Sequence, residues 1–193
     1  MSQFFETIKV NRGFIHDMRL HEDRLKSTIL KNFGKCEDIN FKPLIKPIDK
    51  AFYRCKIHYS NRVEKVEFIE QKKRFFKSFK IVHDNSLVYD FKYSDRKKLE
   101  QILLERENCD DVIIVKNSLL TDTTIANIAL FINGVWITPK KPLFKGIIRT
   151  KLLKSGFLKR RDLRVCDFKK CKKFAIMNSL VGFLEIKDFI IKE

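Results

Sequence analysis

The sequence of 193 residues is predicted to fold as an α+β or α/β protein with two unequal lobes. Two observations lead to this class. Apolar residues alternate in some segments, as in strands, and recur every three or four positions in others, as in helices. A polar stretch that contains Asp-Asn-Ser also divides the chain, so we expect a small lobe at 1–83, a linker at 84–90 and a larger lobe at 91–193.

The smaller lobe is predicted to be a sheet with one helix packed on it. Met18, Leu25, Ile29 and Phe33 recur at helical spacing, and Gly34 is a natural helix end. The sequence Asn-Arg-Gly at 11–13 favours a hairpin turn. Strands are expected at 4–10, 53–59 and 66–69, with a further strand that ends at 81–82.

The larger lobe is predicted to hold two helices among several strands. One helix should start near Ser94, and another should open near Gly146 and run through Leu153. Asn133-Gly134 is a strong turn signal. Strands are expected at 112–115, 125–132, 135–137, 174–177 and 183–186.

The charge of the chain is strongly positive, with 41 Lys and Arg against 24 Asp and Glu, a net +17. Such a charge attracts polyanions. However, the basic residues are spread along the chain, the runs at 71–74, 159–161 and 169–173 interrupt apolar segments, and no aromatic RNA-binding signature accompanies them. We therefore expect a Lys-rich solvated surface and a small anionic substrate, with no nucleic-acid partner.

Several features of the sequence lead us to expect a cytoplasmic protein. No apolar run approaches the roughly 18 residues that would span a bilayer, and the first residues lack the pattern of a signal peptide. The five cysteines are scattered, and only Cys166 and Cys171 are close in sequence, so we expect reduced thiols and no zinc site.

Four separated motifs carry the chemistry. They are His-Glu-Asp-Arg-Leu at 21–25, Phe-Lys-Tyr-Ser-Asp-Arg at 91–96, Leu-Thr-Asp-Thr-Thr-Ile-Ala-Asn at 120–127 and Gly-Ile-Ile-Arg-Thr-Lys-Leu-Leu at 146–153. In this order they resemble the class IV aminotransferase family, which includes branched-chain and D-amino-acid transaminases and 4-amino-4-deoxychorismate lyase. The resemblance extends from residue 4 to about residue 190 through the segments 5–8, 136–139 and 178–183.

The resemblance implies the two-lobed fold type IV of pyridoxal-5′-phosphate (PLP) enzymes and makes Lys92 the amine that binds the cofactor aldehyde. A free lysine with a pKa near 10.4 is neutral only about 0.04% of the time at pH 7. An imine held in a suitable site removes this limitation, and the released amine can then transfer protons. With so many lysines in the chain, a surface lysine is the alternative interpretation.

The resemblance also places Asp122 beside the cofactor ring nitrogen, with Asn127 five residues later as in the family motif. A carboxylate there keeps the ring nitrogen protonated, so that the cofactor can accept electrons. The family usually has Glu at this position, and Asp is one methylene shorter. The alternative for Asp122 is a residue of an Asx-type turn.

The cofactor phosphate is expected at the start of the helix near Gly146. By resemblance, the amides of Ile147 and Ile148 bind it and Arg24 supplies a cation. A hydroxyl residue often stands where this chain has Ile148, so one side-chain hydrogen bond is lost. Arg149 is expected to have a structural role in capping its helix.

The C-terminal loop decides between reactions within the family. Asn178, Ser179 and Leu180 are more similar to the lyase than to the Gly-Thr-Ala turn of transaminases. Tyr93, Arg54 and Lys56 are further possible contacts of the substrate carboxylates, although each could equally be a strand-face or surface residue. We therefore expect a PLP-dependent 4-amino-4-deoxychorismate lyase that gives 4-aminobenzoate and pyruvate, and the resemblance to the family implies a homodimer.

Two alternatives remain open. One is a class IV aminotransferase that acts on branched-chain or D-amino acids, because elimination and transamination share their early steps. The other is a basic binding protein that has this fold but no cofactor.

Overall fold

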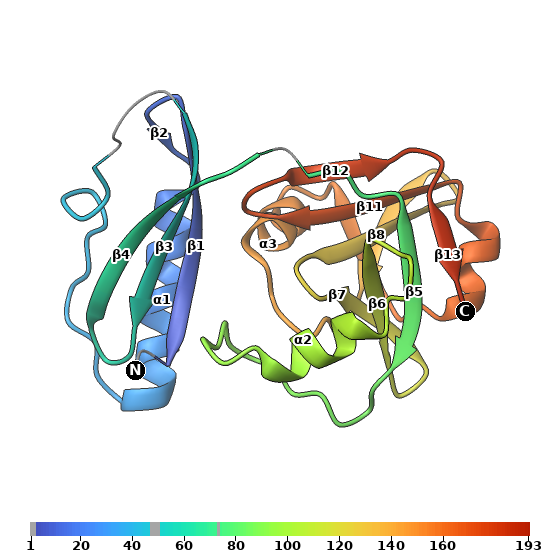
Figure 1. The fold of residues 1–193 in the computed structure, drawn as a ribbon, viewed down its shortest axis with the longest axis horizontal. Coiled ribbons are helices and arrows are strands. Elements are labelled where there is room, and N and C mark those ends of the chain that lie inside the picture. Colours follow the sequence, from blue (N-terminus) through green and yellow to red (C-terminus); the bar gives the residue numbers. More distant parts are fainter. Residues whose placement is uncertain (1–2, 47–50, 73) are drawn as a thin grey trace. The chain divides into compact units, whose positions relative to one another are not determined.

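The computed structural model describes residues 3–46, 51–72 and 74–193. The chain divides into two compact units (Figure 1). The first unit comprises Met1–Arg74 and Phe91–Asp95, and the second comprises Phe75–Asp90 and Arg96–Glu193. No helix within the described residues has the length and apolar character needed to cross a membrane.

The first unit is an antiparallel sheet of four strands with one long helix packed against it. The strand order is β2-β1-β3-β4. The elements are β1 (Phe4–Asn11), β2 (Phe14–Ile15), α1 (Met18–Phe33), β3 (Phe52–Tyr59) and β4 (Val63–Glu70). Alternate side chains of β1 and β3, including Ile8, Cys55 and Ile57, are buried with Leu25 and Ile29 of α1 in a single core. The prediction of a small sheet with one helix is confirmed.

Two turns of the first unit lie where the sequence predicts them. Arg12 and Gly13 both have positive φ values, 51° and 79°, so that β1 folds back tightly into β2. α1 ends at Gly34, which has a φ of 77° and whose amide donates to the carbonyl of Leu30. Glycine adopts this left-handed conformation without the steric cost that a Cβ brings.

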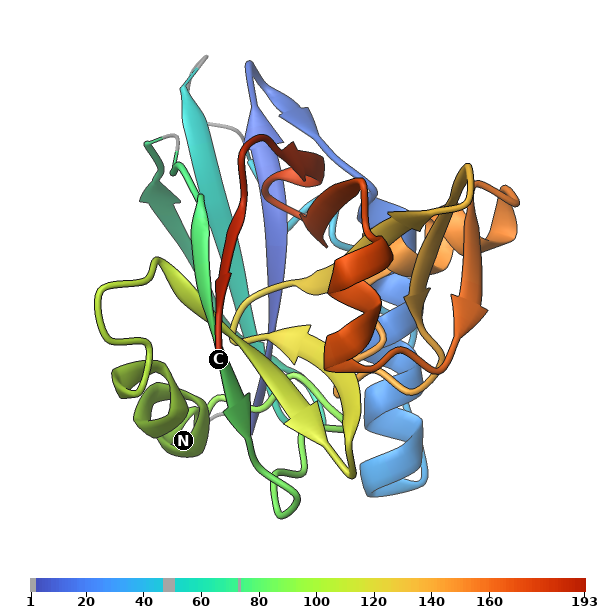
Figure 2. The same cartoon turned by 90° about the vertical axis from the view of Figure 1, so that its right-hand side faces the viewer.

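The second unit is built around a larger mixed sheet (Figure 2). Its main path runs β10-β9-β8-β7-β6-β5-β13, and β11 pairs with β8 and β12. The elements are β5 (Ser78–His83), α2 (Lys97–Leu104), β6 (Asp111–Lys116), β7 (Leu119–Thr123), β8 (Asn127–Ile132), β9 (Val135–Pro139), α3 (Ile147–Lys154), β10 (Leu158–Arg161), the 3-10 helix η1 (Val165–Lys170), β11 (Lys173–Asn178), β12 (Gly182–Ile186) and β13 (Ile190–Lys192).

Most elements predicted for the second unit are present, but three strands and η1 were not anticipated. β10 and β13 contain only four and three residues, and β10 carries mainly exposed basic side chains. Neither strand shows the apolar alternation on which the prediction depends. β7 contains mostly threonine and aspartate, yet four of its five residues are buried. Tertiary packing therefore overrides the local pattern at β7.

The structure places the boundary between the units differently from the expected division at residues 83 and 91. β5 pairs in parallel with β6 and so belongs to the second unit, not to the first sheet. Residues 91–95 return to the first unit, where the amide of Phe5 donates to the carbonyl of Lys92 at 2.9 Å. Both pairings join segments that are distant in sequence, and local periodicity does not reveal such partners.

The segment expected to be a linker is a compact turn of the second unit. Asp84 Oδ1 accepts hydrogen bonds from the amides of Ser86 and Leu87, at 2.7 and 2.8 Å, and from the Ser86 hydroxyl. Leu87 is only 1% exposed, and its carbonyl accepts a hydrogen bond from Lys116 Nζ at 2.6 Å. The polar composition of this segment therefore reflects an Asx turn and not a flexible connection.

The substitution Asp84→Ala should destabilise the second unit by about 1–2 kcal/mol, because three hydrogen bonds lose their common acceptor. Urea unfolding followed by Trp136 fluorescence measures the loss. Asp84→Asn retains an acceptor oxygen and should keep more than half of the stabilisation. Equal losses in the two variants would contradict the role of this oxygen as an acceptor.

Candidate active site

A carboxylate lies on the apolar face of β1, between Phe4 and Ile8. The Glu6 side chain is fully buried, and a buried carboxylate must be paired or hydrogen-bonded. Arg24 of α1 provides the pairing: its Nε donates to Glu6 Oε1 at 2.8 Å and its Nη2 donates to Oε2. This two-point ion pair fixes the orientation of the guanidinium group.

The pKa of Glu6 reflects the strength of this pairing. Burial alone would raise the pKa, but the charge of Arg24 and the hydrogen bonds from His21 and Arg24 outweigh it and lower the pKa from 4.5 to about 2. Glu6 is therefore ionised at neutral pH. The Glu6–Arg24 pair thus holds a cation at a fixed place on α1, as a phosphate-binding residue requires.

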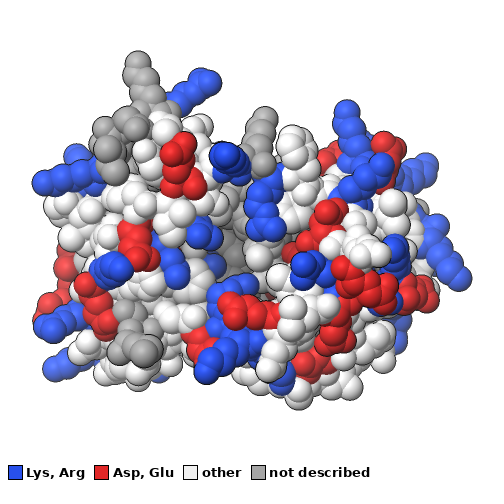
Figure 3. All heavy atoms as spheres, in the orientation of Figure 1, with Lys and Arg blue, Asp and Glu red and all other residues white. Residues whose placement is uncertain are grey.

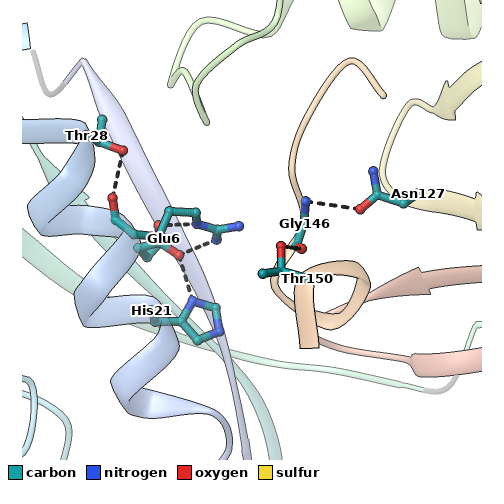
Figure 4. A network of polar contacts seen from close by, with 7 residues as sticks. Glu6, His21, Thr28, Asn127, Gly146 and Thr150 are labelled. Carbon is teal, nitrogen blue, oxygen red and sulfur yellow. Dashed lines mark hydrogen bonds and ion pairs between the residues drawn. The ribbon is translucent and has the colours of Figure 1, made fainter. Parts of the chain in front are cut away.

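His21 forms the third member of this group. Its Nδ1 lies 2.6 Å from Glu6 Oε2, while its Nε2 is buried and has no hydrogen-bond partner within the described part of the chain (Figure 4). Burial lowers the pKa of His21, although the Glu6 carboxylate opposes this effect. A neutral imidazole that donates from Nδ1 leaves Nε2 as an acceptor.

Lys92 lies on the segment that extends the first sheet beside β1. The next residue, Tyr93, pairs with Phe4 in an isolated bridge. The Lys92 ammonium lies 4.4 Å from the centroid of the Phe5 ring, and its charge contributes to the lowered pKa of His21. A partly buried primary amine held at a fixed position is suited to bind a carbonyl carbon covalently.

In the second unit, Asp122 and Asn127 form a buried pair across β7 and β8. Asn127 Nδ2 donates to Asp122 Oδ1 and to the carbonyl of Phe144, both at 2.7 Å. The amide of Phe144 donates to Asp122 Oδ2 at 2.9 Å. Since a carboxylate offers about four acceptor positions, Asp122 retains the capacity to accept a further donor.

Burial raises the pKa of Asp122 to about 7, although Asn127, the amide of Phe144 and the charge of Arg149 all act to lower it. The negative charge of Asp122 is therefore incompletely compensated by the protein itself. A cationic N–H group next to this carboxylate would supply the missing compensation. A protonated pyridine ring is such a group, so the residues present fit a pyridoxal cofactor.

Gly146 brings the start of α3 very close to Asn127. The Gly146 amide donates to Asn127 Oδ1 at 3.1 Å, and a Cβ at this position would lie 2.2 Å from that oxygen (Figure 4). Only glycine fits this approach. One side chain thus connects the Asp122 carboxylate to the first turn of α3.

The first turn of α3 is suited to an anion. Ile147 and Ile148 are buried, and the hydrogen bonds within the described residues include no acceptor for their amides. Helix N-terminal amides that lack partners bind phosphate groups. The hydroxyl of Thr150 donates to the Gly146 carbonyl at 2.9 Å, so it does not replace the hydroxyl that is missing at Ile148.

Arg149 is buried and has a structural role, but it does not cap its own helix start. Its Nη2 donates to the carbonyl of Pro139 at 2.8 Å, and its Nε donates to the Thr138 hydroxyl at 3.3 Å. Arg149 therefore connects α3 to the end of β9. This arrangement differs from the expected capping role because the side chain reaches a neighbouring strand.

The C-terminal loop that the sequence analysis singled out is the turn between β11 and β12. Asn178 Oδ1 accepts hydrogen bonds from the amides of Leu180 and Val181 at 2.9 and 3.0 Å, and Asn178 Nδ2 donates to the Ile125 carbonyl at 3.2 Å. The Asn178 side chain thus closes the turn that contains Ser179. The amides of Leu180 and Val181 are already occupied.

The three further contacts considered for a substrate carboxylate all lie in the first unit. The ring of Tyr93 packs against those of Phe4 and Phe91, at 5.4 and 5.9 Å between centroids. Arg54 and Lys56 lie on β3, on the face opposite to the buried Cys55 and Ile57. Tyr93 therefore contributes to packing, while Arg54 and Lys56 are half-buried on the other face of the sheet, where the Arg54 Nε atom is buried.

Sequence reasoning did not assign a role to Glu6 or His21. A signal was present, because Glu6 occupies an inward position of an alternating strand between Phe4 and Ile8. A carboxylate in such a position predicts a buried cationic partner. The basic residues do not mark a binding site in the same way. On the face of each unit shown in Figure 3, Lys and Arg are mixed with Asp and Glu.

Substitution of Glu6 by Gln should destabilise the first unit by about 3 kcal/mol at pH 7, because Arg24 loses its counter-charge. The pKa of Glu6 is lowered from 4.5 to about 2. The stability due to ionised Glu6 is therefore complete above about pH 4.5 and is lost as the pH falls toward 2. Urea unfolding of both proteins between pH 7 and pH 2.5 tests this: an equally steep acid loss in Glu6→Gln would contradict the assignment.

Asp122→Asn should change the stability in the opposite pH direction. The pKa of Asp122 rises from 3.8 to about 7 on folding, so the native state holds a proton that the unfolded chain releases. The wild type should therefore lose stability as the pH rises from 4 to 7, and the variant should lose less. Asp111, whose pKa burial also raises, is present in both proteins, so the difference between them isolates Asp122.

Comparison with known proteins supports one family. The profile of the class IV amino-transferase family matches residues 57–189, more than half of the chain. A protein of Haemophilus influenzae whose activity is uncharacterised is 29% identical over 187 residues, covering 94% of this chain and all of the relative.

Solved structures show the same fold. A candidate 4-amino-4-deoxychorismate lyase from Haemophilus somnus 129PT is 26% identical, with a TM-score of 0.87 and coverage of 94% of this chain and 98% of its own. A candidate amino-acid aminotransferase from Mesorhizobium loti is 18% identical, with a TM-score of 0.81 and coverage of 97% and 99%. The predicted two-lobed fold type IV is confirmed. This chain therefore belongs to the class IV aminotransferase family of enzymes.

Proposed function

We propose that this chain is a PLP-dependent 4-amino-4-deoxychorismate lyase, which releases pyruvate and 4-aminobenzoate. The class IV family is PLP-dependent. The observation that carries the proposal is the buried Asp122–Asn127–Gly146 network, in which an incompletely compensated carboxylate is tied to a helix start with vacant amides. The likeness to the Haemophilus somnus protein, named for the lyase activity, favours this reaction within the family.

Each binding residue has a defined role in this proposal. Lys92 would hold the aldehyde carbon of the cofactor through its amine, and Asp122 would accept a hydrogen bond from the protonated ring nitrogen. The amides of Ile147 and Ile148 would hold the phosphate, with Arg24 as the fixed cation. Asp122 is shorter than the usual Glu, and the direct bond from Asn127 to its carboxylate holds it in one orientation.

Proton transfer is assigned to Lys92. When bound, the cofactor accepts the electron pair that is left on the substrate carbon carrying the amino group. Once the substrate amine has displaced Lys92 from the aldehyde, the neutral Lys92 Nζ takes the proton from that carbon. The neighbouring carbon–oxygen bond then breaks, which makes the ring aromatic, and the enolpyruvate that leaves gains a proton to become pyruvate. The proton taken by Lys92 can return to this leaving group, so the step is balanced.

The C-terminal turn favours elimination over transamination. In the transaminases that this family includes, the amides of a Gly-Thr-Ala turn are expected to bind the substrate carboxylate. Here the amides of Leu180 and Val181 donate to Asn178 Oδ1, so the turn offers neither to a substrate. An aminotransferase acting on branched-chain or D-amino acids is therefore the second choice.

A basic binding protein without cofactor is the third choice. Such a protein would not need an uncompensated buried carboxylate, which makes folding less favourable as the pH rises above about 4. A role in catalysis would account for a carboxylate at this position despite its cost in stability. The homodimer and the small anionic substrate stay predictions.

The purified protein, saturated with PLP, should release pyruvate from 4-amino-4-deoxychorismate, measured with coupled lactate dehydrogenase. It should absorb visible light as a bound imine and lose this absorption on borohydride reduction. Lys92→Ala should lose the absorption and reduce pyruvate release by about 10²- to 10⁴-fold, because the proton-transferring amine is removed.

Lys170→Ala, which removes an exposed lysine of η1, is the matched control and should behave as the wild type. Transfer of the amino group to a 2-oxo acid without pyruvate release would move the assignment to an aminotransferase. A colourless wild-type protein that binds nucleic acid with a steep salt dependence would support the binding protein instead.

A further inference from the structure

We propose that Arg96 is a positioning residue, which holds the buried Asp122–Asn127 pair in place through the turn that connects these two residues. Arg96 is the last residue of the motif at 91–96, but neither the binding of the cofactor nor the proton transfer described above uses it. The inference rests on the proposed role of Asp122 beside the cofactor ring. It adds a residue that acts through this carboxylate and does not need to touch the reacting atoms.

The guanidinium group of Arg96 donates hydrogen bonds to two groups of the second unit. Its Nη2 donates to the carbonyl of Thr124 at 2.8 Å, and its Nη1 donates to the hydroxyl of Tyr89 at 3.0 Å. The Cζ atom of Arg96 also lies 5.8 Å from the centroid of the Tyr89 ring. Hydrogen bonds from a charged donor are stronger than neutral ones, and the planar shape of the guanidinium group fixes the directions of both bonds. Arg96 therefore fixes the Thr124 carbonyl relative to Tyr89.

Thr124 is also held by a second group, at the start of β6. Oδ1 of Asp111 accepts hydrogen bonds from the Thr124 hydroxyl at 2.7 Å and from the Thr124 amide at 3.4 Å. Thr124 is only 5% exposed, so its carbonyl also requires a partner, and this partner must be a donor. Arg96 supplies the donor. The amide, the hydroxyl and the carbonyl of Thr124 are thus all bound, and its position is fixed.

The turn that contains Thr124 connects the two residues of the buried pair. Asp122 and Asn127 stand opposite each other where β7 pairs with β8. Thr123 closes the turn, because its amide donates to the carbonyl of Ala126 at 2.9 Å and its hydroxyl oxygen accepts a hydrogen bond from the Ala126 amide at 3.1 Å. In so short a turn, the position of Thr124 determines where the Asp122 and Asn127 side chains are placed.

A second route leads from Arg96 to the same carboxylate. The ring of Tyr89 packs edge-to-face against that of Phe144, with 6.0 Å between the centroids. The Phe144 amide donates to Asp122 Oδ2 at 2.9 Å, and the Phe144 carbonyl accepts a hydrogen bond from Asn127 Nδ2 at 2.7 Å. Arg96 therefore acts on both segments that hold the pair, directly on the turn and through Tyr89 on the segment of Phe144.

Helix α2 holds the backbone of Arg96 in place. Arg96 stands directly before α2, and its carbonyl accepts a hydrogen bond from the amide of Glu100 at 2.8 Å. Leu99 and Ile102 are both only 3% exposed, so they anchor α2 on the second unit. The guanidinium group thus extends from a fixed backbone. Since a displacement of about 1 Å at a reacting group can lower a rate by about 100-fold, this support of the carboxylate matters for catalysis.

The test compares Arg96→Met with a matched control, Arg106→Met. Arg106 is also half-buried, and its Nη1 donates to a main-chain carbonyl, that of Leu103 near the end of α2, at 3.1 Å. Amide hydrogen exchange is measured by NMR on the full chain without added PLP. In Arg96→Met the amides of Ala126 and Phe144 should exchange about 10-fold faster relative to those of β6, because a charged donor to the turn is lost. In Arg106→Met this ratio should stay as in the wild type.

The side chain of Asp122 provides a second readout. Burial raises its pKa to about 7, so a turn that loosens and admits water should let this pKa fall toward 3.8 in Arg96→Met. Carbon-13 NMR of labelled aspartate carboxyl groups follows the titration, and Asp122→Asn distinguishes its signal from that of Asp111. Arg96→Lys keeps the charge but has no planar fork for both acceptors, so it should show the same changes at smaller size. Tyr89→Phe removes one acceptor and should also change less than Arg96→Met.

The outcomes separate this inference from the proposed function. If neither Arg96→Met nor Arg96→Lys changes the exchange at Ala126 and Phe144, the inference is wrong, even if the protein releases pyruvate. An equal rise in exchange along β6 would make Arg96 a residue of general stability and would also overturn the inference. If the turn loosens as expected but the wild type binds no PLP, the proposed function fails, whereas the positioning of Asp122 by Arg96 stands.

Discussion

The first unit depends on one buried charge, the carboxylate of Glu6 on the apolar face of β1. Leaving water costs such a group several kcal/mol unless its partners are close and well oriented. Arg24 and His21 meet this condition from a single helix, three residues apart, so both lie on the same face of α1. The same contacts determine how α1 is rotated against the sheet and where its cationic group is held.

The second unit contains a buried carboxylate, Asp122, whose pKa shifts in the opposite direction. Burial raises the pKa of Asp122 to about 7, because the donors that contact it in the described structure are neutral and the charge of Arg149 compensates only in part, whereas the pKa of Glu6 falls to about 2. One carboxylate is thus permanently charged and serves the architecture. The other can gain or lose a proton near neutral pH, which is typical of functional sites.

Local sequence patterns predicted most of the structure, because most elements bury one regular face. The alternation of Cys55, Ile57 and Tyr59 and the helical spacing of Leu25 and Ile29 are examples, and Gly34 marks the helix end correctly. Pairing across distant segments was not predictable in this way. The parallel partner of β5 and the return of residues 91–95 to β1 depend on contacts that no local period contains.

The candidate site shows the same division between local and distant information. Motifs singled out Lys92, Asp122, Asn127 and Gly146 as candidate residues, whereas the contact between Asp122 and Asn127 is seen only in the structure. The connection of Asn127 to Gly146 and Phe144 joins residues 17 to 19 positions apart, and only the fold shows it. The bond from Arg96 to the Thr124 carbonyl, which joins residues 28 positions apart, also required the fold.

The return of residues 91–95 to the first sheet has a consequence for how such a protein can be modified or can evolve. The chain crosses between the units three times, and the lysine-bearing segment is an insertion that completes the edge of a sheet begun about ninety residues earlier. A single junction in the sequence therefore cannot exchange one unit for that of a relative. A chimera that takes its first 74 residues from a relative must also take residues 91–95, or the grafted sheet loses its flanking segment.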